Sequence, residues 1–289
     1  MVGIAVREQM VHEPYFSMLI FIAALAAGCL GALTGLGGGV ILIPLMVLVF
    51  KVDVHYAIGT SLVAVIATSS GAAAAYVREG YTNVRIAMLL EVATVGGALL
   101  GAYLAGLIEP RAIMAIFSLV LFWSAWSTMR EPKHAHEAAT SDALALRLRL
   151  PGEYPTAKGM QAYAVRNAAP ALGVMFGAGA LSALVGIGAG IVKVVAMDRL
   201  MRLPFKVSTT TSNFMLGVTA AASAGVYFHR GQIDPGLTMP VVLGTLLGAL
   251  MGTRILTRAK SKTLRIVFAC LVLVSGVQLM RKALMGGAG

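Results

Sequence analysis

The chain has 289 residues, of which 58% are hydrophobic and only 12% are charged, and it contains 33 glycines. This composition is too apolar for a water-soluble protein, and it excludes intrinsic disorder and a disulfide-rich secreted scaffold. The net charge of +11 would suit nucleic acid, but the basic residues punctuate apolar segments instead of forming one basic patch, so we expect no nucleic-acid partner. The expected solvent of the chain is the lipid bilayer.

Eight long stretches of the chain are almost free of charge. In chain order they are residues 16–50, 57–77, 86–108, 112–129, 167–192, 207–228, 236–253 and 266–280. The first stretch is 35 residues long, and a helix of that length exceeds a hydrocarbon core of about 30 Å. The fifth stretch stays largely apolar as far as Met197. Both stretches are therefore predicted to turn inside the membrane.

Each of these two stretches contains a glycine cluster where the turn is needed, at residues 35–39 and at residues 186–190. Glycine permits such a turn because it has no Cβ atom. Each stretch is predicted to form two helical pieces, either two short spans or one re-entrant pair. The chain then has five pieces in each half and ten in all.

The two halves resemble one another at a constant offset of 151 residues. Residues 27–39 (AGCLGALTGLGGG) match residues 178–190 (AGALSALVGIGAG) at 8 of 13 positions, and Tyr76 and Gly80 meet Tyr227 and Gly231 without a gap. A constant offset over this length indicates an internal repeat. We predict a first membrane repeat at residues 1–129, a linker at 130–166 and a second repeat at 167–289.

The number of pieces per repeat sets the orientation of the repeats. Because five is odd, the second copy enters the membrane from the opposite side, and the topology is predicted to be inverted. Sixteen Lys and Arg residues then fall on the side of the linker and six on the other side. Since positive loops stay in the cytoplasm, the central loop is predicted to be cytoplasmic and both termini external.

The glycine breaks carry the functional prediction. Inverted repeats with broken helices are typical of secondary transporters, in which the N–H groups of half-helices point at an anion near the midplane. The alternative is that the glycines only allow close helix packing, and that the neighbouring hydroxyls only cap helices. The candidate substrate-binding residues are Gly37, Gly38, Gly39, Thr60, Ser61, Gly188, Ala189, Gly190, Thr211, Ser212 and Asn213.

Two ionisable residues lie within apolar segments, where a charge is costly and therefore a functional candidate. Glu91 is a candidate for proton coupling, or else the partner of a cation on a neighbouring helix. Lys193 is a candidate for attracting the anion, or else extends to the interface near Asp198. We find no catalytic set and expect no enzyme activity, no metal and no cofactor.

The motifs GALTGLGGG (31–39) and SALVGIGAG (182–190), in two similar halves joined by a polar loop, resemble the TauE/SafE family of sulfite and organosulfonate exporters. The resemblance implies an all-α polytopic carrier in the bacterial inner membrane that exports small sulfur-containing anions, such as sulfite or sulfoacetate, by alternating access. An anion channel of similar architecture and a transporter of another small anion remain alternatives. The anion, the driving ion and the oligomeric state stay open.

Overall fold

The computed structural model describes residues 14–34, 39–129, 140–156, 159–186, 188, 190–256 and 261–285. Its first half contains α2 (Pro14–Thr34), α3 (Gly39–Leu48), α4 (Val54–Arg78), α5 (Val84–Ala105) and α6 (Pro110–Met129). Its second half contains α8 (Ala168–Val185), α9 (Gly190–Val195), the π-helical turn η1 (Ala196–Leu200), α10 (Phe205–His229), α11 (Pro235–Leu256) and α12 (Ser261–Met285). The predicted all-α architecture, with five helical pieces on each side of the linker, is confirmed for the described residues.

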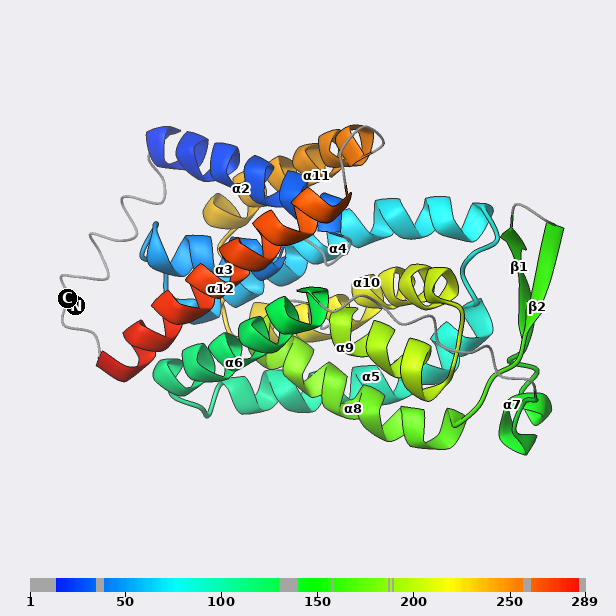
Figure 1. The fold of residues 1–289 in the computed structure, drawn as a ribbon. Coiled ribbons are helices and arrows are strands. Elements are labelled where there is room, and N and C mark those ends of the chain that lie inside the picture. Colours follow the sequence, from blue (N-terminus) through cyan, green and yellow to red (C-terminus); the bar gives the residue numbers. More distant parts are fainter. Residues whose placement is uncertain are drawn as a thin grey trace.

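The linker, expected from its sequence to be a polar loop, contains a short helix and two strands. After the short helix α7 (Ala143–Arg147), strands β1 (Gly152–Thr156) and β2 (Gly159–Tyr163) form an antiparallel hairpin, in which Gly152 pairs with Tyr163. Residues 130–139 lie outside the described part. The hairpin and α7 stand at one end of the helical bundle, which we call the linker end (Figure 1).

The helix boundaries repeat at the offset found in the sequence. Adding 151 to the bounds of α4 gives those of α10, and the same shift converts α5 into α11. The backbone follows the offset too, since Lys51 and Arg202 both have a positive φ, of 54° and 57°. Gly80 and Gly231, in the turns that follow α4 and α10, have φ of 76° and 67°. The two halves therefore share local structure as well as sequence.

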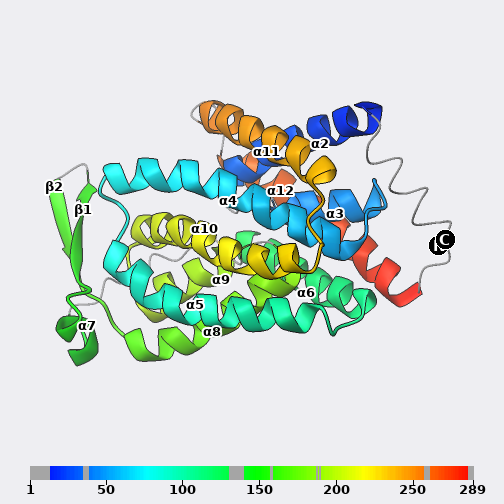
Figure 2. The ribbon, with the colours of Figure 1, turned by 180° about the vertical axis from the view of Figure 1, so that it is seen from behind.

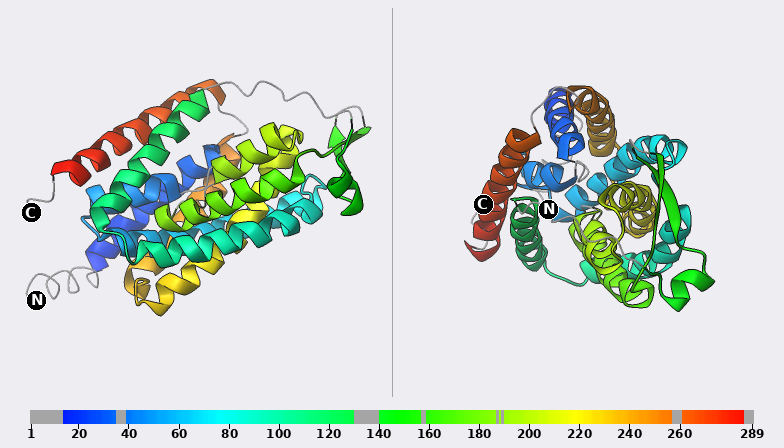
Figure 3. Two further views of the ribbon diagram at one scale, coloured as in Figure 1. Left: turned by 90° about the horizontal axis from the view of Figure 1, so that it is seen from below. Right: turned by 45° about the vertical axis from the view of Figure 1, so that its right-hand side comes forward.

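The helices pair across the two halves. α2 packs on α11, α5 on α8, α6 on α12 and α4 on α10. The α6–α12 pair forms one flank of the molecule, as Figure 3 shows. Corresponding helices run in opposite directions: in Figure 1, α4 runs from left to right and α10 from right to left, and the reverse view of Figure 2 agrees.

Two of these pairs depend on glycines at the contact. A Cβ atom on Gly97 of α5 would collide with the carbonyl oxygen of Phe176 on α8. At the offset positions, a Cβ atom on Gly248 of α11 would collide with the carbonyl oxygen of Leu25 on α2. These glycines let two backbones approach closely, as small residues do in membrane helix pairs.

The outer faces of the helices are apolar. Met88 and Val92 on α5 are 62% and 77% exposed, and Met239 and Leu243 on α11 are 59% and 49% exposed. Such a surface would be costly in water and suits a hydrocarbon solvent. Among the described residues, α5 and α8 are each long and apolar enough to cross a bilayer alone. This is the surface of a membrane protein, with its polar groups turned inward.

Candidate functional site

Helices end at both glycine clusters, as the sequence predicts. α2 ends at Thr34 and α3 begins at Gly39, while α8 ends at Val185 and α9 begins at Gly190. The second break is described in part: Gly186 and Gly188 have φ of 70° and 74°, in the left-handed region that favours glycine. The predicted site residues Gly37, Gly38 and Ala189 lie outside the described residues.

The second break is packed against the first half of the chain. The Ser61 hydroxyl on α4 donates to the carbonyl oxygen of Gly186 at 2.9 Å. A Cβ atom on Gly186 would meet Ile43 of α3 and Ile58 of α4, each at 2.9 Å. The Ser212 hydroxyl of α10 donates to the carbonyl oxygen of Gly190 at 3.2 Å. Ser61 and Ser212 thus lie at the break, together with Gly188 and Gly190.

The other predicted hydroxyls lie elsewhere. Thr60 forms a hydrogen bond with Thr238 of α11 at 3.2 Å. The Thr211 hydroxyl accepts from the backbone N–H of Asn83 at 3.1 Å, at the linker end. Asn213 is half-buried on α10, and Gly39 is buried at the start of α3. The structure therefore brings Ser61 and Ser212 to the described break, and it places Thr60 and Thr211 in contacts between other elements.

The two ionisable candidates meet through one threonine hydroxyl. Thr219 of α10 donates to Oε1 of Glu91 at 2.5 Å. Lys193 Nζ donates to the same Thr219 hydroxyl at 2.5 Å and to the carbonyl oxygen of Met215 at 3.4 Å. Lys193 is fully buried and Glu91 is 8% exposed. We call Glu91, Thr219 and Lys193 the buried triad.

The burial of Lys193 bears on the two roles considered for it. Its ammonium is bonded to Thr219 and Met215 inside the bundle, which speaks against extension to the interface, while attraction of the anion stays a prediction. For Glu91, the carboxylate is linked to the Lys193 ammonium through the Thr219 hydroxyl, and proton coupling stays a prediction. Its second oxygen, Oε2, is buried without a hydrogen-bond partner among the described residues. A buried carboxylate with one unsatisfied oxygen is costly unless a proton or another donor joins it.

Thr219 is the member of the triad that sequence reasoning missed. It lies seven residues after the candidate Ser212, and therefore on the same face of α10. Ser208 and Ser223 lie on this face as well, and all four side chains are at most 1% exposed. In the sequence, the signal for Thr219 is this row of polar residues at helical spacing inside an apolar segment.

Asn83 ties the linker to the bundle at the linker end. Its Oδ1 accepts from the backbone N–H of Ile86 and so caps α5, while its Nδ2 donates to the carbonyl oxygen of Leu150 and to the Tyr163 hydroxyl. Burial raises the pKa of Tyr163, and the bond from Asn83 opposes this shift. The linker is thus docked beside the start of α10, where Thr211 lies.

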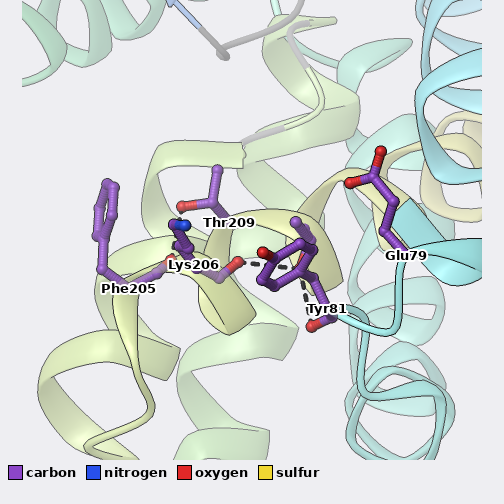
Figure 4. A pocket seen from close by; sticks show the side chains of 6 residues that line it. Glu79, Tyr81, Phe205, Lys206 and Thr209 are labelled. Carbon is purple, nitrogen blue, oxygen red and sulfur yellow. Dashed lines mark hydrogen bonds between the residues drawn. The ribbon is translucent and has the colours of Figure 1, made fainter. Parts of the chain in front are cut away.

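A pocket also opens at the linker end, between the turn after α4 and the first turns of α10 (Figure 4). Its lining residues are Glu79, Tyr81, Phe205, Lys206, Thr209 and Thr210. Lys206 Nζ lies 5.3 Å from the centre of the Tyr81 ring, a cation–π contact. The pocket contains none of the predicted binding residues.

Comparison with known proteins agrees with this architecture. The family profile described as sulfite exporter TauE/SafE matches residues 20–279. The chain is 24% identical to the probable membrane transporter protein YunE of Bacillus subtilis, over 91% of this chain and 97% of the relative. It is 28% identical to the probable membrane transporter protein YjnA of the same organism, over 91% of this chain and all of the relative.

A probable membrane transporter protein of Xylella fastidiosa is 27% identical, over 86% of this chain and 88% of the relative. No solved structure matches the chain. The profile match extends over nearly all of the helical bundle, from α2 to α12, and includes both glycine breaks and the buried triad. The chain therefore belongs to the sulfite exporter TauE/SafE family of membrane transport proteins.

Proposed function

We propose that the chain is a secondary transporter that exports small sulfur-containing anions, such as sulfite, sulfoacetate or related organosulfonates, across the bacterial inner membrane by alternating access. The observation that carries the proposal is the second helix break, which is held against α3 and α4 and is followed three residues later by the buried ammonium of Lys193. A buried cation that follows a helix break closely in the sequence suits the binding of an oxyanion. The relatives are named as probable membrane transporters.

The architecture supports two repeats of opposite orientation as the moving parts. The repeats at 1–129 and 167–289 pack across one another through α2 with α11 and α5 with α8, and their corresponding helices run in opposite directions. Rocking of one repeat against the other would open the site to each side in turn. Positive side chains favour a cytoplasmic linker end, because Arg85 and Arg149 lie together there.

Transport by the purified protein in liposomes tests the proposal. Uptake of sulfite, sulfoacetate, sulfate and thiosulfate is measured with and without an imposed pH gradient. We expect saturable uptake of a sulfur anion and exchange of internal for external substrate. A flux that rises linearly with concentration and shows no exchange would identify the alternative, an anion channel. Absence of flux for all four anions would reject the proposed substrates.

A further inference from the structure

The charges of the buried triad occupy only one of two equivalent places in the fold. The offset of 151 residues places Val242 opposite Glu91, Leu42 opposite Lys193 and Thr68 opposite Thr219. Leu42 is fully buried, and the Thr68 hydroxyl donates within its own helix, to the carbonyl oxygen of Ala64. The same helix arrangement is thus built in the other half without any charge. Folding alone therefore does not require the two charges of the triad.

The bonds of the triad leave both charged groups incompletely satisfied. In the described part of the chain, two of the three N–H groups of the Lys193 ammonium have partners, Thr219 and Met215. Glu91 is satisfied at Oε1 and has no partner at Oε2 among the residues that the structure describes. The Thr219 hydroxyl holds the two charged groups together, and each group still has room for another hydrogen-bond partner.

We propose that the buried triad is an exchange site in which Lys193 alternates between Glu91 and the transported anion, and in which Glu91 takes up one proton when the anion displaces it. This inference rests on the proposed function. The sulfonate or sulfite oxygens accept hydrogen bonds from the ammonium, and the carboxylate that loses its counter-charge is neutralised by a proton from water. The ligand class is a small oxyanion, and the proton that enters with each anion balances one of the anion's negative charges.

Other ionisable residues lie on the elements that carry the triad or pack against it. α8 carries no ionisable residue, and α5 adds Arg85 near its start and Tyr103 near its end. The ionisable residues on the remaining neighbouring elements are Asp198 and Arg199 on η1 and Lys206, Tyr227 and His229 toward the ends of α10. Glu91 is joined to the Lys193 ammonium by two hydrogen bonds that share the Thr219 hydroxyl.

The test is the pH dependence of sulfoacetate binding to the detergent-purified protein, measured by calorimetry between about pH 6 and pH 8. Sulfoacetate is the probe because sulfite itself changes charge in this interval. One linked proton weakens binding about tenfold for each pH unit of increase. Glu91→Gln mimics the protonated state, and we expect it to bind sulfoacetate tightly at every pH. Glu79→Gln makes the same change at an exposed carboxylate and should keep the wild-type slope.

The outcomes separate this inference from the proposed function. Wild-type binding that does not change with pH, or a wild-type slope retained in Glu91→Gln, overturns the exchange while leaving a transporter of sulfur anions. Absence of binding for sulfoacetate, sulfite, sulfate and thiosulfate overturns both. The double variant Glu91→Val with Lys193→Leu carries the residues of the other half; we expect it to fold and to bind none of these anions. Wild-type affinity in this variant also overturns the exchange.

Discussion

Replacement of Glu91 by Val or of Lys193 by Leu, the residues at the equivalent positions of the other half, is expected to destabilise the protein more than replacement of both together. Lys193→Leu alone leaves the Glu91 carboxylate buried without its ammonium, and Glu91→Val alone leaves the reverse. Breaking a buried pair by removing one partner costs about 3–5 kcal/mol, whereas replacing both partners by apolar residues is often neutral or stabilising. The double variant should therefore be more stable than either single variant.

The size of the expected change in Tm follows from the burial of Glu91 and Lys193 and from the packing of Leu42 at the equivalent position of the first half. Lys193 is 0% exposed and Glu91 is 8% exposed, so water screens neither charge. Leu42 already fits the equivalent position of α3 with no exposure, which indicates that this packing accepts leucine. For a chain of this size, each single variant should lower Tm by roughly 10 °C, and the double variant should stay within about 4 °C of the wild type.

Thermal unfolding of the four proteins in the same detergent measures this cycle. Intrinsic fluorescence is a suitable probe, because the variants leave both tryptophans in place. A double variant whose Tm falls by the sum of the two single effects would refute the reasoning. In that case the two charges would act independently, and the shared Thr219 hydroxyl would not couple them.

Three further substitutions test other parts of the account. Gly97→Ala should lower the free energy of unfolding by about 1–3 kcal/mol, because it overpacks α5 against α8. The control Gly96→Ala, whose Cβ would lie 3.6 Å from the Phe176 ring, should not lower Tm. Equal Tm values for the two variants would contradict the packing argument. Asn83→Ala should cost about 1–3 kcal/mol through the lost cap and linker bonds and speed proteolysis within the linker; an unchanged cleavage rate would speak against docking. Ser61→Ala should weaken sulfoacetate binding several-fold at nearly constant Tm, and unchanged affinity would remove the second break from the site.

Local sequence patterns predicted the bundle well. Charge-free stretches located the helical pieces, because a helix in lipid must be apolar along its length. The overlong stretches located the breaks between α2 and α3 and between α8 and α9, because glycine is the residue that ends a helix without steric strain. The offset of 151 residues anticipated the matching bounds of α4 and α10.

Local patterns could not predict contacts between residues that are far apart in the sequence. Glu91 and Thr219 are 128 residues apart, and only the packing of α5 on α10 brings them together. Thr211 is predicted at the anion site as a helix-terminal hydroxyl, and the hydrogen bond that it accepts from the turn before α5 is a contact that local patterns do not predict. The hairpin at 152–163 was read as a polar loop because its two short strands carry little apolar alternation.

Counterflow of labelled sulfoacetate into liposomes preloaded with unlabelled sulfoacetate tests the central claim most directly, namely that the chain carries a small anion at a site whose positive charge is Lys193. The wild type should show transient accumulation of label, and the double variant Glu91→Val with Lys193→Leu, folded and inserted, should show none. Counterflow by the double variant at the wild-type rate would contradict the account.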